Sequence, residues 1–401
     1  MQYTAKVLEH FMNPRNIGEI PDADGVGTVG SEECGDMIRV WIKVSDEHLS
    51  DIKYKVFGCP TAIACCSMMT EIAIGKHVDD AWNLTDDQVA EALGGLPEYK
   101  YHCSNLAAST LHKAIMNYIF NSVAKKELLS IRILVDNTSS DNFKSEHGLS
   151  LWIRYGQKSI LFDTGQTNLL LQNAKISGVD LTDTDAIVLS HGHYDHTGCL
   201  PAVLKIASKA KIYLHPAATE QKFSQKNSGA NYIGMPDLAK KSIQGRLVTW
   251  TAAPAYLFPT LAVTGQIPRI NDFEDVGGAF FTNDNCQEPD ELLDDQALFI
   301  ESTKGLVVVL GCAHSGVVNT LDYISELTGQ NEIYAVIGGM HLINASKIRI
   351  ANTVEAFKKY NVQKIVPLHC TGQKAMEDFK HALGNRCLFL GAGENISFMS
   401  D

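Results

Sequence analysis

The chain has 401 residues, 45% hydrophobic and 20% charged, which is typical of a folded soluble protein with two or three domains. Its 34 basic and 46 acidic residues give a formal net charge of −12, which argues against nucleic acid as the main partner, because binding a phosphate backbone needs a basic face. No apolar run approaches the roughly 20 residues that span a bilayer and no signal-peptide core begins the chain, so we expect a cytoplasmic protein, with no membrane partner, whose ten cysteines are thiols.

The first part of the chain, residues 1–126, predicts a small α+β unit. A glycine-rich loop is expected over 18–30, and apolar and polar residues alternate in two strand-like runs, 38–44 and 52–57. Helical patterns cover the ranges 3–11, 62–74, 85–92 and 104–126.

The pattern changes after a short charged junction at Lys125-Lys126-Glu127. Strand-like runs now cover 131–135, 149–155, 159–162, 186–189, 211–214, 305–310, 333–337 and 364–367. Helical patterns lie between many of them, at 200–207, 317–327 and 351–360. This alternation predicts layered sheets covered by helices. The stretch 223–291 is irregular and rich in Pro and Gly, and we expect substrate-binding loops or a lid there.

The first candidate site consists of three cysteines, Cys34, Cys59 and Cys103, each at a point where a strand or loop gives way to the next element. Cys103 begins a predicted helix, where the helix dipole lowers a thiol pKa and favours thiolate. His102 adds an imidazole, and Asp36 stands two residues from Cys34 as a labile oxygen ligand. Three thiolates and one weak ligand suit a site that binds a metal and releases it. Ordinary buried thiols are the alternative, since none of the three belongs to a CxxC pair.

Residues 1–126 resemble the NifU/IscU-type iron–sulfur scaffold domain along their whole length. The matching stretches are Val7-Leu8-Glu9-His10-Phe11, Asn13-Pro14-Arg15-Asn16, Cys34-Gly35-Asp36, Phe57-Gly58-Cys59, Leu96-Pro97 and Lys100-Tyr101-His102-Cys103-Ser104. The resemblance implies a scaffold, not an enzyme, that accepts sulfur, assembles a [2Fe–2S] cluster or binds iron, and passes the cluster on. Cys34, Cys59 and Cys103 would be its cluster ligands.

The same resemblance implies further roles and partners. Asp36 would tune the lability of the cluster, His102 would be an additional metal ligand, and Cys103 would accept the sulfur. A cysteine desulfurase is the implied partner, with cluster-acceptor proteins or a chaperone as further candidates and a homodimer where two scaffolds share a cluster. The family often has a second proline in the segment that resembles a chaperone-recognition loop, whereas Glu98 follows Pro97 here. We expect the additional cysteines, Cys65 and Cys66, to be small buried residues.

The second candidate site is the stretch Ser-His-Gly-His-Tyr-Asp-His, directly after the predicted strand 186–189. A turn at a strand end can aim several side chains at one point. We expect His191 and His193 to face one metal ion, and Asp195 and His196 to face a second. Two ions about 4 Å apart share a water molecule and lower its pKa. A surface histidine cluster is the alternative, but four ligand residues at this spacing are rarely accidental.

This stretch is the signature of the metallo-β-lactamase fold, and residues 130–401 resemble that superfamily throughout. Leu161-Phe162-Asp163-Thr164-Gly165 matches an early Asp-rich turn of the family, in which Asp163 would support the ligands. The resemblance implies an αββα sandwich as a second domain. It also implies two divalent metals, zinc as the first expectation and iron or manganese as the alternatives.

More ligands must come from later strand ends. We expect His314, in Gly-Cys-Ala-His-Ser-Gly, to join the first ion, and His369, in Pro-Leu-His-Cys-Thr-Gly, to join the second. His341, in Gly-Gly-Met-His-Leu, has the same placement and could bind substrate, act as an acid or replace His314. We predict Asp195 and His341 as the catalytic residues.

These three motifs resemble one branch of the superfamily, the dihydropterin ribofuranosylaminobenzene phosphate synthase-like proteins. The usual His-Thr-Pro-Gly-His segment and the Gly-Asp of the bridging aspartate are both absent. Asp294 and Asp295 are candidates for the bridge, although acidic loop residues are more often solvated, and His215 is expected to be structural.

The predicted function is therefore an iron–sulfur cluster scaffold fused to a metal-dependent hydrolase-fold domain that activates water on a small, pterin-like or phosphorylated substrate. His193 favours a hydrolase, because oxygen-reducing relatives usually have Glu there together with a flavin domain, which this chain lacks. A metal-storage or metal-sensing protein without turnover is one alternative, and a redox di-iron protein is another.

Overall fold

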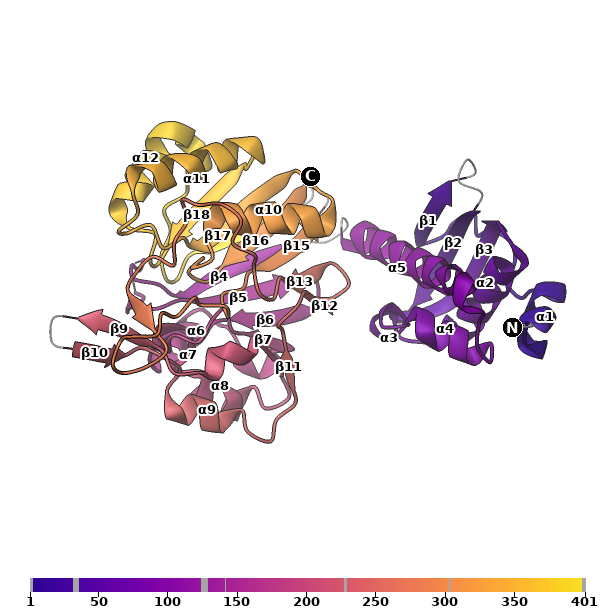
Figure 1. Ribbon diagram of the computed structural model, residues 1–401, viewed down its shortest axis with the longest axis horizontal. Coiled ribbons are helices and arrows are strands. Elements are labelled where there is room, and N and C mark those ends of the chain that lie inside the picture. The colour runs from indigo at the N-terminus through magenta and orange to yellow at the C-terminus, as the bar shows by residue number, and fades with distance from the viewer. Residues whose placement is uncertain are drawn as a thin grey trace. The chain divides into compact units, whose positions relative to one another are not determined.

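The structure is a computed structural model that describes residues 3–31, 36–123, 129–140, 142–226, 229–302 and 304–398. The chain divides into two compact units (Figure 1). The main body of the first is Met1–Lys126, and that of the second is Glu127–Leu257 with Leu261–Asp401. Within the described ranges, every helix is too short or too polar to cross a bilayer.

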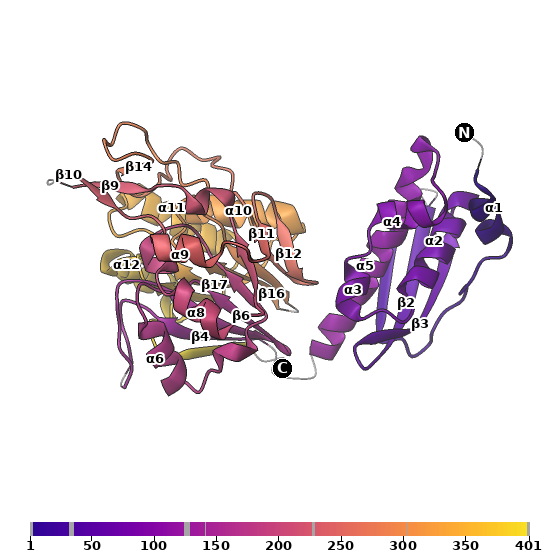
Figure 2. The same ribbon diagram turned by 90° about the horizontal axis from the view of Figure 1, so that it is seen from below.

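The first unit is an antiparallel sheet covered by helices. Its strands, in the order β1-β2-β3, are β1 (Gly25–Ser31), β2 (Asp36–Ser45) and β3 (His48–Phe57). Its helices are α1 (Ala5–Met12), α2 (Pro60–Ala73), α3 (Val78–Trp82), α4 (Asp86–Ala92), the short 3₁₀ turn η2 (Glu98–Lys100) and α5 (Tyr101–Val123). Figures 1 and 2 show α2 and α5 lying along one face of this sheet.

The glycine-rich loop predicted over 18–30 is wrong in its second half, because strand β1 begins at Gly25. A Cβ atom on Gly25 would lie 2.2 Å from the carbonyl oxygen of Ala114, and one on Gly27 would lie 2.3 Å from that of Thr110. The glycines therefore allow the backbone of α5 to rest directly on the strand, a close approach that only glycine permits. The local sequence alone predicts these glycines as loop residues and does not reveal their contact with α5.

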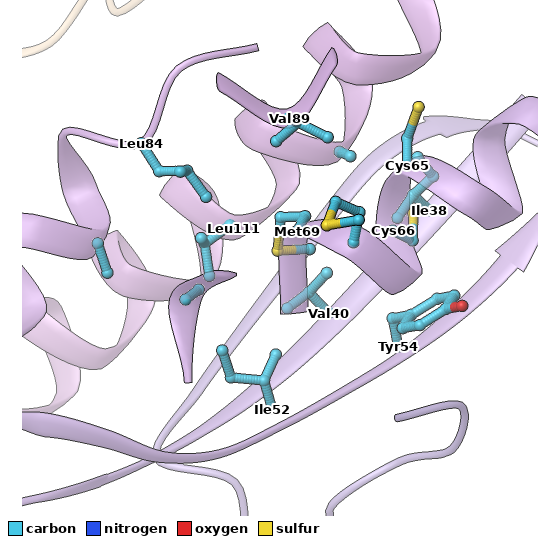
Figure 3. Close-up of a cluster of buried hydrophobic side chains, with 14 of the residues drawn as sticks. Ile38, Val40, Ile52, Tyr54, Cys65, Cys66, Met69, Leu84, Val89 and Leu111 are labelled. Atoms are coloured by element: carbon cyan, nitrogen blue, oxygen red, sulfur yellow. The ribbon is translucent and has the colours of Figure 1, made fainter. Parts of the chain in front are cut away.

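The core of the first unit lies between its sheet and its helices (Figure 3). Val40 and Ile52 of the sheet, Met69 of α2 and Leu111 of α5 are all fully buried. Cys65 and Cys66 are buried as well, as expected, and belong to this hydrophobic cluster.

The second unit contains two larger sheets. One has the order β11-β8-β7-β6-β5-β4-β19 and the other the order β12-β13-β15-β16-β17-β18. The strands of the first are β4 (Leu129–Val135), β5 (Ser150–Tyr155), β6 (Lys158–Phe162), β7 (Ala186–Val188), β8 (Lys211–Leu214), β11 (Val248–Trp250) and β19 (Asn395–Phe398). The strands of the second are β12 (Ala255–Phe258), β13 (Leu261–Val263), β15 (Leu298–Ser302), β16 (Gly305–Leu310), β17 (Ile333–Gly339) and β18 (Lys364–Leu368).

Helices cover the outer faces of both sheets, which makes an αββα sandwich (Figure 1). Apolar side chains of α6 (Leu169–Ile176), α8 (Leu200–Ile206) and α9 (Asp237–Ser242) pack on the first sheet. Those of α10 (Val317–Thr328), α11 (Lys347–Lys359) and α12 (Gln373–Leu383) pack on the second. Short turns complete the unit: α7 (Tyr194–Thr197), η3 (Leu181–Asp183), η4 (Pro216–Thr219) and η5 (Gly384–Arg386).

The stretch predicted to be irregular, 223–291, contains more regular structure than expected. Besides α9 and β11 to β13, it forms a small sheet in the order β10-β9-β14, from β9 (Phe223–Lys226), β10 (Gly229–Tyr232) and β14 (Phe280–Phe281). These strands are two to four residues long, too short to show a period of two in the sequence.

Parallel strands bring the predicted ligand motifs to common edges. Strands β6, β7 and β8 run parallel, and so do β16, β17 and β18. Asp163 directly follows β6, and the histidine-rich turn follows β7. The motifs with His314, His341 and His369 follow β16, β17 and β18 in turn. Since the carboxyl ends of parallel strands meet at one edge, each group of motifs gathers there.

Candidate metal centres

The cysteine site of the first unit is described in part. Cys34 lies outside the described residues, and Asp36 is the first residue of β2. Cys59 caps the start of α2, and its Sγ lies 3.7 Å from the Sγ of Cys103 in the first turn of α5. The Nε2 atom of His102 lies 3.4 Å from the same Cys103 sulfur. The structure therefore brings Cys59, His102 and Cys103 together.

The surroundings of Cys59 favour a thiolate. Burial raises the pKa of the Cys59 thiol, but hydrogen bonds from the backbone N–H of Ala62, from Cys103 and from other neighbours outweigh it and leave the pKa lowered. One of these neighbours is Lys100, whose Nζ donates to the Cys59 sulfur over 3.4 Å. A thiolate is the form of cysteine that binds metals.

Three histidines of the second unit form one group of candidate ligands. The Nε2 atom of His191 lies 2.9 Å from the Nδ1 atom of His193, and the ring centroid of His314 lies 5.0 Å from each of theirs. Ligand atoms of all three lie within 4.8 Å of one another. The rings of His191 and His314 are fully buried.

A second group lies beside the first. The Oδ2 atom of Asp195 is 3.9 Å from the Nε2 atom of His196 and 3.3 Å from that of His369, and these two nitrogens are 3.3 Å apart. An exposed histidine, His147, adds an Nε2 atom 3.0 Å from the same carboxylate oxygen. All six predicted metal ligands of the C-terminal domain therefore gather in two adjacent groups.

In three of the histidine rings, a hydrogen bond made by the nitrogen that points away from the ligand group determines which nitrogen faces the group. His196 bonds through Nδ1 to the Asp163 carboxylate, and His369 bonds through Nδ1 to the Asn137 side chain. His314 donates from Nδ1 to the carbonyl oxygen of Val276 over 2.8 Å. These bonds leave Nε2 of each ring facing the ligand group, the arrangement that metal-binding histidines usually have.

The electrostatics of the first group and of Asp195 fit bound cations. Burial lowers the pKa of His193 to about 3, and burial also holds the pKa values of His191 and His314 well below the usual value, so these rings are neutral. Burial alone would raise the pKa of Asp195, but His196 and the other neighbouring histidines hold it well below its usual range. Neutral imidazoles and an ionised carboxylate are the forms that bind metals.

A buried polar atom without a hydrogen-bond partner also supports a fit to bound cations. Among the described residues, Nε2 of His314 is buried and makes no hydrogen bond, although a buried polar atom without a partner costs free energy. A metal ion at the His191, His193 and His314 group would satisfy it. The residues present therefore fit two divalent cations.

Four non-glycine residues in the motifs that follow the parallel strands adopt the same strained, left-handed backbone conformation. Asp163, Ala313, His341 and His369 all have positive φ values, of 59°, 53°, 43° and 50°. Non-glycine residues rarely adopt this left-handed conformation, which costs of the order of 1–3 kcal/mol per residue and clusters at functional sites.

Two cysteines were not predicted as part of the site. Cys312 lies with its Sγ 3.2 Å from Nε2 of His196 and 3.3 Å from the Sγ of Cys370, and both cysteines are buried. Both stand within the motifs that supplied His314 and His369, and this shared position is the signal that could have identified them.

The remaining candidates take supporting positions. His341 is packed against His314, with ring centroids 4.3 Å apart. The expectation that Asp294 and Asp295 are solvated is wrong, because both are buried. Asp294 accepts hydrogen bonds from the backbone of Gly192 and from the buried Lys222, and so holds the histidine-rich turn in place.

Phe280 forms an aromatic wall beside the histidines. It lies on β14, within the stretch where substrate-binding loops were expected. Its ring centroid is 5.5 Å from those of His193 and His314 and 6.1 Å from that of His341.

Comparison with known proteins identifies both units. Residues 2–125 match the NifU-like N terminal domain, and residues 146–323 match the metallo-beta-lactamase superfamily. The iron-sulfur cluster assembly scaffold protein IscU 1 of Archaeoglobus fulgidus is 58% identical over 116 residues, which cover 29% of this chain and 76% of that protein.

The C-terminal unit has equally clear relatives. The 7,8-dihydropterin-6-methyl-4-(beta-D-ribofuranosyl)-aminobenzene-5'-phosphate synthase of Methanocaldococcus jannaschii is 33% identical over 295 residues, which cover 69% of this chain and 99% of that protein. The crystal structure of Tm1679, a metal-dependent hydrolase of the beta-lactamase superfamily, is 30% identical with a TM-score of 0.60 and covers 68% of this chain and 99% of that one. The chain thus belongs to two families at once, as an N-terminal NifU/IscU-type scaffold domain fused to a C-terminal domain of the metallo-β-lactamase superfamily.

Proposed function

We propose that the chain assembles or carries an iron–sulfur cluster on its first unit and hydrolyses a small anionic substrate at a dinuclear metal centre in its second. The observation that carries the second part is the meeting of two ligand groups. The imidazoles of the first, His191, His193 and His314, are neutral, and the second joins the ionised carboxylate of Asp195 to His196 and His369. Two adjacent cations so held are the arrangement that activates water for hydrolysis.

For the first unit, the proposal is that Cys34, Cys59 and Cys103 bind a [2Fe–2S] cluster or iron, with Asp36 and His102 as weaker ligands. The proximity of Cys59, His102 and Cys103 supports this, as does the 58% identity to an IscU scaffold. The proposed partners are a cysteine desulfurase as sulfur donor and proteins that accept the cluster.

Metal ions at the second site would lower the pKa of a water molecule toward neutrality and polarise an ester or phosphoester bond. The chain's own residues then handle the protons. The Asp195 carboxylate accepts a proton, and exposed His147, 3.0 Å away, passes it to solvent. The Nδ1 atom of His341 makes no hydrogen bond among the described residues, which suits it to protonate the leaving oxygen.

The proposed substrate is small, phosphorylated and pterin-like. The Phe280 ring beside the three histidines offers a planar aromatic surface on which a flat heterocycle can stack. The name of the Methanocaldococcus relative, a dihydropterin ribofuranosylaminobenzene phosphate synthase, supports the same class.

The test is to measure metals and acid-labile sulfide per chain on anaerobically purified wild-type protein and on the variants Cys34→Ala and His193→Ala. We expect sulfide and its iron to be lost only from the cysteine variant. The metals of the second site should fall only in the histidine variant. Absence of sulfide after reconstitution with iron and a desulfurase would contradict the scaffold role.

Hydrolysis is tested separately with a chromogenic phosphodiester and a phosphorylated pterin. We expect turnover by the metal-loaded protein, and a loss of at least about 100-fold in Asp195→Asn, because the change removes a metal ligand together with the proton acceptor. A wild-type protein that binds two metals and turns over neither compound would favour metal storage or sensing instead.

A further inference from the structure

The second metal position lacks the carboxylate bridge that the sequence suggested. Both oxygens of Asp294 are occupied, one by the N–H of Gly192 and the other by Lys222. Asp295 accepts the N–H of Ser315, and within the described residues it belongs to no group of converging ligands. Among the described residues, the groups of converging ligands contain one carboxylate, that of Asp195, so a further anionic ligand would help to balance the charge of two cations.

Cys312 lies where its thiolate could supply such an anionic ligand. Its ligand atom lies within 4.8 Å of those of His191 and His196 in one group, of His314 and His341 in a second, and of His369 and Cys370 in a third. The Nε2 atom of His196 lies 3.2 Å from this sulfur. A zinc-bound nitrogen lies about 2.0 Å from the ion and a zinc-bound sulfur about 2.3 Å. Two such atoms on one ion are therefore separated by about the distance seen between His196 and Cys312, or slightly more.

The backbone conformation around Cys312 brings its sulfur close to the histidines. A Cβ atom on Gly311 would lie 2.0 Å from Oγ of Ser190, so only glycine lets the end of β16 approach the turn after β7 so closely. Ala313 then adopts its left-handed conformation, with φ of 53°. Cys312 and His314, on either side of Ala313, thereby both reach the histidine cluster.

In an inference that rests on the proposed dinuclear centre, we propose that Cys312 is a thiolate ligand of the second metal ion, together with Asp195, His196 and His369. Cys370, 3.3 Å from it, hydrogen-bonds to the ligand sulfur and does not bind the metal. A thiolate among imidazoles selects zinc, iron or cobalt over magnesium and manganese, which prefer oxygen ligands.

The test uses cobalt(II) as the probe, because a thiolate bound to cobalt(II) gives a strong near-ultraviolet charge-transfer absorption that imidazole and carboxylate do not give. The full chain carries Cys34→Ala, Cys59→Ala and Cys103→Ala, so that the first unit contributes no thiolate. Cobalt(II) is titrated into the metal-free protein, and stoichiometry and absorption are recorded together.

We expect two cobalt ions per chain and a thiolate absorption from one of them. Adding Cys312→Ala should abolish the absorption and weaken the second ion by at least about tenfold, the lower end of what support residues around a metal contribute. Cys312→Asp should restore the second ion without the absorption, which separates loss of a ligand from loss of the fold. Two control variants should keep the absorption: Cys370→Ala, which removes the hydrogen-bond donor to the ligand sulfur, and Cys387→Ala, which removes a buried thiol that belongs to no ligand group among the described residues.

A thiolate absorption that survives Cys312→Ala, or that vanishes in Cys370→Ala alone, would overturn the assignment. Two cobalt ions bound without any thiolate absorption would overturn it as well, while the dinuclear centre itself would stand. Failure to bind cobalt at all would instead remove the dinuclear centre on which the assignment rests.

Discussion

Asp163 and His196 are joined by a hydrogen bond of 2.7 Å between Oδ2 and Nδ1, and neither side chain is exposed to solvent. The same carboxylate accepts the hydroxyl and the backbone N–H of Ser190. Ser190 in turn contacts Nδ1 of His191 over 2.9 Å. One carboxylate thus orients a histidine in each ligand group.

Replacing this carboxylate should weaken both metal positions. We expect Asp163→Asn to lower metal affinity by about 10–100-fold, because an amide is a poorer acceptor than a carboxylate and orients His196 less firmly. Competition with a chromogenic chelator measures the change. Asp183→Asn, at an exposed carboxylate of the same unit, is the control. Equal affinity in both variants would show that Asp163 has no part in holding the ligands.

A second prediction separates His314 from His341 as the third ligand of the first ion. Only His314 belongs to the group with His191 and His193. We therefore expect His314→Gln to bind one metal fewer per chain, and His341→Gln to retain both while losing turnover. Elemental analysis after gel filtration measures the stoichiometry. The reverse pattern would make His341 the ligand.

Phe280 should contribute to binding of a planar substrate and not to binding of metal. We expect Phe280→Ala to weaken binding of a 6-substituted pterin about tenfold, which is the loss of about 1–1.5 kcal/mol of stacking. Fluorescence of the pterin reports the affinity, and metal content should be unchanged. Phe281→Ala, at the next residue of the strand, is the matched control, since successive side chains leave a strand on opposite faces. Equal losses in both variants would contradict stacking on Phe280.

Gly27→Ala should destabilise the first unit by about 1–3 kcal/mol or more, because the new methyl group meets the backbone of α5 at 2.3 Å and must push the helix away. Hydrogen–deuterium exchange in peptides from β1 and α5 measures the local effect. The exposed neighbour Thr28→Ala should change stability by less than about 0.5 kcal/mol. Unchanged exchange in Gly27→Ala would mean that the helix does not rest on the strand.

Acid should destabilise the first unit in part through His112. Burial lowers the pKa of this residue, and its Nε2 bonds to the carbonyl oxygen of Leu84. The folded state therefore binds a proton less readily than the unfolded chain. The resulting stability is fully present above the unfolded pKa of about 6.5 and is lost as the pH falls below it.

Exchange in peptides of α5, compared between about pH 7.5 and about pH 5 after correction for intrinsic exchange rates, measures this loss. His112→Gln, which cannot gain the charge, should lose less stability over the same interval than the wild-type protein. His48→Gln, at an exposed histidine of the same unit, should behave like the wild-type protein. An identical loss in His112→Gln would assign the acid sensitivity to other groups.

The sequence indicated which ligand motifs would come together more reliably than it indicated the structure around them. The His191–His196 turn, His314 and His369 could be grouped because each motif directly follows an apolar run, and the ends of parallel strands converge. Cys312 escaped prediction because a buried cysteine in a motif looks like any small core residue until its neighbours in space are known. Strand β1 escaped it for a related reason, since Gly25 and Gly27 serve a contact with α5, nearly ninety residues away.

The turn from Gly311 to Gly316 carries Cys312 and His314 on either side of one left-handed residue, so a single short piece of backbone would hold a ligand for each ion. An ion at the first position would fix His314 and thereby also fix the adjacent sulfur. The second ion would then meet a ligand whose freedom had already been lost. Loading of the two positions would consequently be coupled, so that an ion at the first position raises the affinity of the second.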